Sequence, residues 1–419
     1  MSRLAKREKI SIMILTVLVG VLATGYIANS VGNKIENTTN KTVTQTVQAA
    51  TTVKNNTLTG VNKEVSSHAV RLIGNETLFS SEDLKQTADL SGATQISVVN
   101  NRDTDITKGG VYVIRGNAKE STITVNVPEN DEVKLVLDGV NISNRDFPAI
   151  YVKSAGKIFV TTTKGSDNKL EVTGNFVNEG STKVDSTVFS NSDLTINGTG
   201  KLTVISSTGN GVTSKNNLKM TGGTYVINSE KHGFEGDNSI AISDGDFTIN
   251  TGKDGFHSEN SNDNLKGYIY VSGGNFTINA EDDGIQATTF ATIDGGTFKI
   301  NAAEGIEATH VQINNGNIDI EASDDGINAA EKSTAYKINL EVNGGTINIV
   351  MAPGDTDAFD SNGDLTINGG KININANSPF DFDGTGQLNG GDITVNGKKV
   401  TELTNQFMGG FPGRRGGRR

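Results

Sequence analysis

The chain lacks two residue types altogether: none of its 419 residues is cysteine or tryptophan. The absence of cysteine excludes disulfide bonds, a zinc-thiolate site, a cysteine nucleophile and a lipid-modified cysteine. Hydrophobic residues are also scarce at 34%, but this share omits 50 glycines, and the two together match an ordinary globular chain. The sequence can therefore still build a core, from stacked Ile, Val, Leu and Phe.

What the chain has in abundance is a repeated unit between residues 194 and 395: a strand, a Gly-Gly turn, a second strand, and then an acidic-Gly-aliphatic step. The second glycines of the turns fall at 200, 223, 245, 274, 296, 316, 345, 370 and 391, so the spacing lies between 20 and 29 residues. A period near 22 residues is typical of a solenoid.

Alternation within the units indicates strands rather than helices. In the segment FKINA, Phe298, Ile300 and Ala302 fall on one face and Lys299 and Asn301 on the other, as in a half-buried strand. The Gly-Gly pairs, such as Gly295-Gly296, supply a tight corner with a positive φ. Three short strands and three turns use about 22 residues, so we predict an all-β fold, a right-handed parallel β-helix, with the hand taken from the general rule for parallel crossovers.

The ends of the chain differ from the repeats. Basic residues followed by the apolar run at 10–28 predict export, and residues 1–28 are expected to be a signal peptide or a membrane anchor. Residues 29–67 indicate a flexible Thr/Asn-rich tether, and 68–132 an N-terminal cap and first strands, with a short capping helix at 80–93. The β-helix is expected at 133–400, and 401–419 indicates a disordered Gly/Arg-rich tail.

Insertions and acidic residues gather at one corner of the predicted coil. The two longest spacings come from insertions at 258–267 and 329–338, both after the acidic-Gly step. Insertions at one corner mark a side of the solenoid that can carry function.

Two columns of polar residues start at the same acidic-Gly step. Column A is Asn210, His232, Asp254, Asp283, Glu304, Asp325 and Asp357, and column B, three residues later, is Thr213, Glu235, His257, Gln286, Glu307, Asn328, Asp360 and Asp381.

Stacked carboxylates need a counter-charge. Equivalent positions of a parallel β-helix lie about 4.8 Å apart, where like charges repel by roughly 1 kcal/mol in water and about 3 to 4 kcal/mol at an effective dielectric of 20. A calcium ion takes six to eight oxygen ligands with flexible geometry, so calcium is the predicted cofactor. Turn chemistry alone explains one acid per corner, but not the doubled carboxylates. The predicted ligands are Asp254, Asp282, Asp283, Glu304, Glu307, Asp324, Asp325, Asn328, Asp357 and Asp360.

The order of these motifs resembles a family of exported bacterial carbohydrate-binding proteins described as calcium-containing right-handed parallel β-helices. The resemblance covers residues 80–408 and is carried by DLSGA, GVYVI, KLVLDGV, FPAIYVKSAGKIFVTTT, NGTGKLTV, GKDGFHSEN, AEGIEATHVQIN, SDDGINAA and GDTDAFDSNGDLTINGG. It implies a cell-surface protein that binds cellulose or pectin-like polymers and is related in structure to calcium-dependent polysaccharide lyases. The family's acidic ladder falls on Asp254, Asp283, Glu304, Asp325 and Asp357, whereas Asn210 and His232 depart from it.

Three functions remain open from the sequence. The first is a non-catalytic polysaccharide binder, for which Glu235, His257, Gln286 and Tyr268 are the predicted contacts. The second is a calcium-dependent lyase, whose base would be Lys231, Lys253 or Lys332. The third is a surface adhesin or spacer. The net charge of −11 argues against nucleic acid as a partner. We expect a monomer that binds polysaccharide outside the cell and associates with the membrane through its N-terminus.

Overall fold

The computed structural model describes residues 78–354 and 356–405. Over these residues the protein is all-β, with 32 strands and no helix. None of the described residues forms a helix that could span a membrane. The predicted anchor at 10–28, the tether at 29–67 and most of the predicted tail lie outside the described residues.

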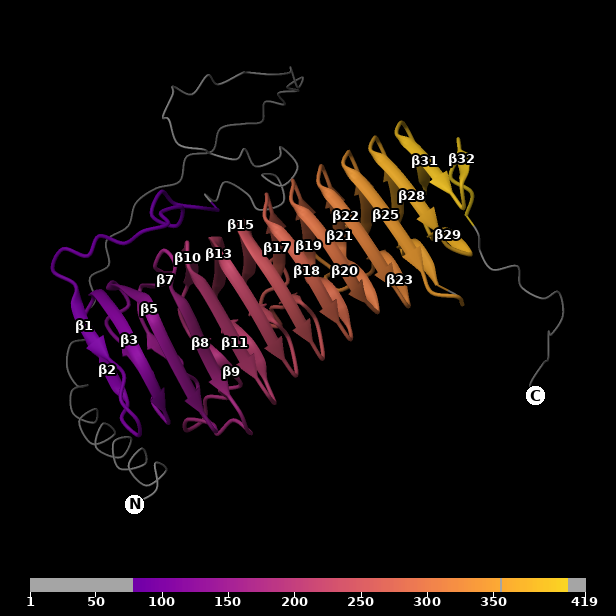
Figure 1. Cartoon of the computed structure of the whole chain (residues 1–419). Coiled ribbons are helices and arrows are strands. Elements are labelled where there is room, and N and C mark those ends of the chain that lie inside the picture. Colours follow the sequence, from indigo (N-terminus) through magenta and orange to yellow (C-terminus); the bar gives the residue numbers. More distant parts are fainter. Residues whose placement is uncertain (1–77, 355, 406–419) are drawn as a thin grey trace, which may run out of the picture. The chain divides into compact units, whose positions relative to one another are not determined.

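The strands pair side by side in three ladders, and Figure 1 shows them following one another in chain order. Ladder one joins β1 (Thr94–Ser97), β3 (Gly110–Lys119), β5 (Glu132–Asn144), β7 (Lys157–Thr162), β10 (Leu194–Gly198), β13 (Asn217–Ser229), β15 (Ser239–Thr251), β17 (Tyr268–Val271), β19 (Asp283–Ile293), β21 (Glu304–Ile313), β24 (Asn339–Val342), β27 (Asp364–Ile367) and β30 (Gly386–Leu388).

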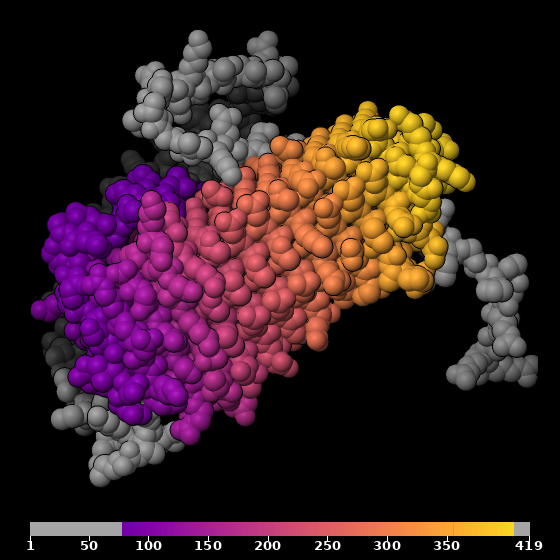
Figure 2. Space-filling view, in the orientation of Figure 1, coloured from indigo at the N-terminus to yellow at the C-terminus, as the bar shows by residue number. Residues whose placement is uncertain are grey.

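Ladder two continues from the second halves of β3, β5, β13 and β15. It adds β8 (Asp167–Val172), β11 (Lys201–Ser206), β18 (Asn275–Ala280), β20 (Thr297–Ala302), β22 (Asn317–Ala322), β25 (Thr346–Met351), β28 (Lys371–Asn375) and β31 (Asp392–Val395). The last strand, β32 (Lys398–Val400), pairs with β31 in the antiparallel direction. Every other named pair is parallel. The colours of successive strands therefore follow one another across the face shown in Figure 2.

Ladder three carries columns A and B. It joins β2 (Thr104–Ile106), β4 (Ile123–Asn126), β6 (Ile150–Ser154), β9 (Ser186–Ser190), β12 (Asn210–Ser214), β14 (Phe234–Gly236), β16 (Phe256–Ser258), the first halves of β19 and β21, β23 (Asp325–Ala329), β26 (Asp357–Ser361) and β29 (Ser378–Phe382). The all-β, parallel part of the predicted fold is thus confirmed.

The core consists of the inward side chains of each strand. In β20, Phe298 and Ile300 are buried while Lys299 and Asn301 are exposed, as the alternation predicted. Aromatic rings stack from strand to strand inside ladder two, with centroids 4.8 Å apart between Phe247 and Phe276 and 4.4 Å apart between Phe276 and Phe298. Because equivalent residues pair in register, the same residue type recurs at the same depth.

The Gly-Gly corners have the predicted backbone. Gly296 has a φ of +112°, and a Cβ atom on it would lie 3.0 Å from the ring of Phe298 and 3.2 Å from the carbonyl oxygen of Gly274. Only glycine meets both demands without strain. In the first unit the positive φ falls on Gly198 rather than on the predicted Gly200.

The predicted capping helix at 80–93 is wrong, because residues 81–84 form a single turn. Ser80 and Asp83 exchange hydrogen bonds between side chains and backbone amides, which closes the turn. The buried Asp83 carboxylate then accepts hydrogen bonds from Lys157 and from Thr195 Oγ1, the latter at 2.7 Å, and lies 3.3 Å from Lys219 Nζ. The partners of Asp83 lie on the neighbouring strands β7, β10 and β13, so the segment around Asp83 runs across the strands of ladder one.

Candidate functional site

Columns A and B lie on ladder three in the register that the sequence predicted. Asp283 pairs with Glu304 and Asp325 with Asp357 in column A, while Glu307 pairs with Asn328 in column B. The residue directly before each column B residue is buried in the core: Val212, Phe234, Phe256, Ile285, Ile306, Ile327, Phe359 and Phe380. The core thus fixes both polar columns on the outer side of ladder three.

Carboxylates come closest together in the middle of the ladder. Among the described residues, two all-carboxylate groups have ligand atoms within 4.8 Å of one another: Asp254, Asp282 and Asp283, and also Asp283, Glu304 and Glu307. Asn328 Nδ2 donates to Glu304 Oε2 at 3.0 Å, while Asn328 Oδ1 is buried without a hydrogen-bond partner among the described residues. Five of the predicted carboxylate ligands, together with the predicted ligand Asn328, therefore converge on one short stretch.

The electrostatics of this stretch are unfavourable without a cation. Burial, reinforced by the neighbouring Asp254 and Glu304 carboxylates, raises the pKa of Asp283 to about 9. Burial, reinforced by Glu307, raises the pKa of Glu304 to about 7. A carboxyl group that holds its proton at neutral pH lacks a positive partner.

The same condition continues toward the C-terminus. Burial, with the nearby Asp360 carboxylate, raises the pKa of Asp325 to about 7. Burial, with Asp357 and Asp381, raises the pKa of Asp360 to about 7. Among the described residues, Asp324, Asp325, Asp357 and Asp360 do not form a group as tight as those around Asp283.

The two predicted insertions meet beside ladder three. Ser333 Oγ donates to the carbonyl oxygen of Asn264 at 2.7 Å, and Thr309 Oγ1 accepts from the backbone amides of Lys332 and Ser333 at 3.0 and 2.8 Å. This packing brings Lys332 Nζ to 2.6 Å from Glu307 Oε2. Of the three lysines considered as bases, Lys332 is the one that forms an ion pair with the columns among the described residues.

Column B residues predicted to bind carbohydrate are engaged within the ladder. Glu235 accepts hydrogen bonds from Thr213 Oγ1 at 3.0 Å and Lys215 Nζ at 3.1 Å. Gln286 Nε2 donates to Glu307 Oε2 at 3.3 Å. His257 Nδ1 lies 2.6 Å from Asp254 Oδ2. All three side chains are half-buried, so their first role is to hold the columns together.

Tyr268, predicted as a carbohydrate contact, has a buried side chain. Its ring stacks on Phe290 with centroids 4.8 Å apart, and Phe290 in turn meets the ring of Tyr336 from the second insertion. Tyr270, its neighbour, is also buried. As residues i and i+2 of one strand, both tyrosines lie on the side of β17 opposite the core residues Ile269 and Val271, where a second apolar cluster buries them.

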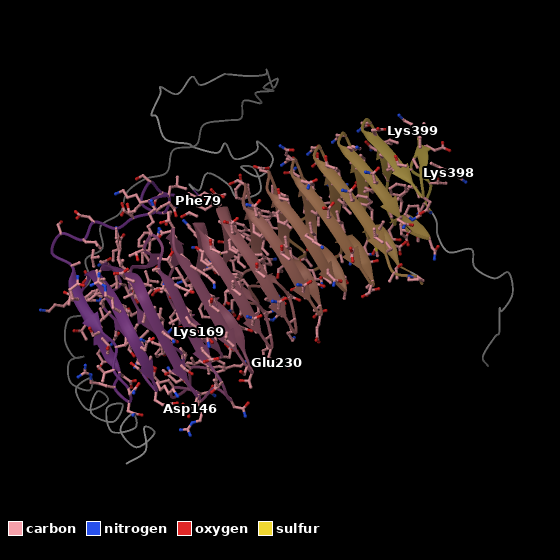
Figure 3. All side chains as sticks on the ribbon, viewed as in Figure 1. Phe79, Asp146, Lys169, Glu230, Lys398 and Lys399 are labelled. Carbon is pink, nitrogen blue, oxygen red and sulfur yellow. The ribbon has the colours of Figure 1, made fainter. Side chains whose placement is uncertain are left out.

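The sequence did not single out a hollow at the end of ladder two. It is shallow and open to solvent, has a volume of about 510 Å³ and is lined by Ile205, Ser206, Ser207, Asn228, Ser229, Glu230, Asn250, Thr251, Asn279, Ala280, Glu281 and Asn301. Its asparagines form a ladder: Asn250 Nδ2 donates to Asn228 Oδ1, and Asn279 Nδ2 to Asn250 Oδ1, both at 3.0 Å. Figure 3 shows Glu230 at the end of β13, near the ends of the neighbouring strands of ladder two. The signal in the sequence was the asparagine that recurs as the next-to-last residue of four successive strands of ladder two, at Asn228, Asn250, Asn279 and Asn301.

Three comparisons describe what this chain is similar to. A curated "Carbohydrate-binding domain-containing protein" from Acetivibrio thermocellus is 38% identical over 125 residues, which are 29% of this chain. The match spans 44% of the relative's own length, less than half. A solved structure titled "Structure of the polysaccharide lyase-like protein from C. thermocellum, Gadolinium derivative" is 32% identical, with a TM-score of 0.48 over 54% of this chain and 96% of that one.

The family model described as "Carbohydrate-binding domain-containing protein" matches residues 100–312 and 303–401. The two segments together include all three ladders over most of their length, with both polar columns and the asparagine ladder. They also cover well over half of the sequence. The chain therefore belongs to the carbohydrate-binding domain-containing protein family.

Proposed function

We propose that the protein binds an acidic or cellulose-like polysaccharide outside the cell without cleaving it, and that calcium held by columns A and B takes part in the binding. The observation that carries the proposal is the group of Asp283, Glu304 and Glu307, three carboxylates within 4.8 Å of one another, with Lys332 paired to Glu307. Membership of the carbohydrate-binding domain-containing protein family supports a carbohydrate as the ligand.

The donors in this group fit a hard cation. Carboxylate and amide oxygens are the ligands that calcium prefers, and calcium accepts six to eight of them in flexible geometry. Asp282, Asp283, Glu304 and Glu307 would hold the ion, and the unpartnered Asn328 Oδ1 would add a neutral oxygen. Bound calcium would supply positive charge to the columns and to the carboxylate of a uronate unit.

The hollow is where we place the sugar chain. Amide side chains that recur along a parallel ladder about every 4.8 Å offer one donor and one acceptor per step to sugar hydroxyls. Glu230 and Glu281 line the hollow, and each lies two residues before a column A residue, His232 and Asp283 respectively. Recognition through hydrogen bonds and cation bridges also suits a chain that has no tryptophan.

The finer parts of the proposal concern fold and location. Three parallel ladders in which each strand pairs with its equivalent in the next unit support a right-handed parallel β-helix, because parallel crossovers take that hand. The basic flank and apolar run at the N-terminus support export and membrane association, with the binding surface outside the cell. We propose a monomer.

The alternative function, a polysaccharide lyase, requires a general base, that is, a lysine that is uncharged when it removes the proton from the sugar. Lys332 is the candidate nearest the carboxylates, but its ion pair with Glu307 outweighs burial and raises the pKa of Lys332 above its ordinary value. A lysine with a raised pKa is a poor general base at neutral pH. The geometry therefore favours binding over elimination.

A pull-down of the full chain tests the function. Insoluble cellulose and immobilised polygalacturonate are incubated with the protein in calcium or in chelator, and the solution is assayed for unsaturated sugar products. We expect calcium-dependent retention without product. Asn279→Ala with Asn301→Ala should weaken retention at least several-fold, whereas Asn375→Ala, at the register position of Asn301 but outside the hollow, should not. Product formation would instead assign a lyase, and no retention on either polymer would overturn the proposal.

A further inference from the structure

The N-terminal part of columns A and B contains a group of a different chemical kind. His232, Asp254 and His257 have ligand atoms within 4.8 Å of one another. His232 Nδ1 lies 3.0 Å and His257 Nδ1 lies 2.6 Å from the same oxygen, Asp254 Oδ2. His232 precedes β14, Asp254 precedes β16, and His257 lies within β16, so the parallel pairing of β14 with β16 brings the three together.

We propose that His232, Asp254 and His257 bind a borderline transition-metal dication, such as Zn²⁺, at a site next to the group of Asp283, Glu304 and Glu307, and that Asp254, although it also lies near Asp282 and Asp283, is a ligand of this dication. Two imidazole nitrogens and one carboxylate oxygen are ligands that zinc and its neighbours prefer, whereas calcium takes oxygen ligands. The proposal stands independently of the proposed function, because it uses neither calcium nor polysaccharide.

The distances suit such an ion. Zinc binds nitrogen and carboxylate oxygen at about 2.0 to 2.1 Å, so ligand atoms of a tetrahedral site lie about 3.3 Å apart. The distance from His232 Nδ1 to Asp254 Oδ2, 3.0 Å, is about 0.3 Å shorter than that value. The distance from His257 Nδ1 to the same oxygen, 2.6 Å, is about 0.7 Å shorter. Small rotations of half-buried side chains would open the group to accept the ion.

The stacking of the two imidazoles supports the same inference. Their ring centroids are 4.1 Å apart and the rings are tilted by only 23°. Two protonated imidazoles so close together would repel each other. Two neutral imidazoles that share one metal ion with Asp254 satisfy the carboxylate without placing two like charges face to face.

The surroundings provide an orienting group and an open side. His257 Nε2, the nitrogen that does not face Asp254, lies 3.4 Å from Glu259 Oε2, as in metal sites where a carboxylate orients a ligating histidine. Asp254 is buried, while the side chains of His232 and His257 are 15% and 12% exposed. Three protein ligands with one exposed side leave a position for water or for an oxygen of another molecule.

Glu235 lies beside the group but is committed to other partners. It pairs in register with His257, and its oxygens accept hydrogen bonds from Asn210 Nδ2, Thr213 Oγ1 and Lys215 Nζ. We therefore assign it as a nearby negative charge rather than a ligand. A dication bound by two neutral histidines and one aspartate carries one net positive charge, which Glu235 offsets.

The experiment uses the full, tag-free chain after removal of metals, in buffer with excess calcium. Co²⁺ is added as a spectroscopic probe and Zn²⁺ as its competitor, and zinc per chain is measured after dialysis. We expect one zinc per chain, a tetrahedral cobalt spectrum, and at least a tenfold loss of affinity in His232→Gln and in His257→Gln. The control His310→Gln, on β21, should bind as the wild type does.

A measurement on the wild type covers the case in which a variant fails to fold. Zn²⁺ should protect His232 and His257, but not His310, from acylation by diethylpyrocarbonate, as mapped by mass spectrometry. Binding that calcium abolishes, equal binding by the wild type and by folded His232→Gln and His257→Gln, or acylation of both histidines that zinc does not slow would each overturn the proposal.

Discussion

The acidic residues of columns A and B have different neighbours in the N-terminal and C-terminal parts of ladder three. In the N-terminal part, β12 to β16, every acidic column residue lies beside a cation or an imidazole: Glu235 beside Lys215, and Asp254 beside His232 and His257. In the C-terminal part, β19 to β29, the columns are mostly carboxylates, and Lys332 is the cation that reaches them among the described residues.

The pKa values of the carboxyl groups separate the two parts. Against burial, the imidazoles of His232 and His257 hold the pKa of Asp254 well below its usual range, and Lys215 lowers the pKa of Glu235. In the C-terminal part, burial and carboxylate neighbours raise the pKa of Asp283 and Asp325. Equivalent backbone positions therefore hold carboxylates beside nitrogen groups in the N-terminal part and carboxylates beside other carboxylates in the C-terminal part.

Removal of calcium should give the largest difference in stability between the two parts of ladder three. We expect chelation to lower the melting temperature of the full chain at pH 8 by on the order of 5 °C or more, because several buried carboxylates then repel one another. Asp283→Asn with Asp325→Asn should remove most of that dependence, and should raise the melting temperature in chelator. The control Asp319→Asn, an exposed residue of ladder two, should keep the full response. Equal melting temperatures of the wild type in calcium and in chelator would contradict the calcium site.

The pH dependence of stability should follow the same division. In the unfolded chain these carboxyl groups lose their protons near pH 4, whereas in the fold the raised pKa values of Glu304 and Asp325, about 7, and of Asp283, about 9, delay that loss. The folded state therefore binds more protons between pH 4 and 9, and its stability falls as pH rises through that window. Denaturation in chelator from pH 5 to 9 should show the fall, and calcium should abolish it. A flat profile in chelator would count against unneutralised carboxylates.

Asp83 is a buried carboxylate that, unlike Asp283, has positively charged partners. Against burial, its hydrogen bonds from Lys157 and Thr195, with Lys219 nearby, hold the pKa of Asp83 well below its usual range. We expect Asp83→Asn to cost about 2 to 3 kcal/mol of unfolding free energy, because two half-buried lysines lose their partner. Its contribution is present above pH 4 and is lost as pH falls below that value, opposite in sign to that of Asp283. Urea titrations at pH 3 and pH 7 would measure it, and an equal cost at both values would refute the ionic origin.

The smallest effect should come from Lys332. Lys332→Met removes the cation beside Glu307 while keeping the apolar stem, and we expect a loss of about 1 kcal/mol in chelator. Calcium should recover most of that loss, since it replaces the missing charge. Lys337→Met, which removes an exposed ion pair with Asp364, serves as the control and should show no such recovery. A loss that calcium leaves unchanged would mean that Lys332 acts by packing alone.

The sequence predicted the ladder because each step of it is local. Alternation decides which side chains of β20 point inward, and a glycine such as Gly296 is required wherever φ is positive and a Cβ would strike the next strand. A period near 22 residues then stacks equal positions, so columns A and B could be written down residue by residue. No contact between distant segments was needed for this step.

Only the tertiary structure decided what faces those columns. The second insertion folds back to place Lys332 at Glu307 and to bury Tyr268 through Tyr336 and Phe290. Residues 80–86 cross ladder one because Asp83 finds cations on separate strands, which no local pattern reveals. His232 and His257 share Asp254 only because side-chain rotations bring both Nδ1 atoms to one oxygen. Local periodicity determined the positions along the ladder, while long-range packing determined their partners, since the free energy of a buried charge depends on what the rest of the chain brings beside it.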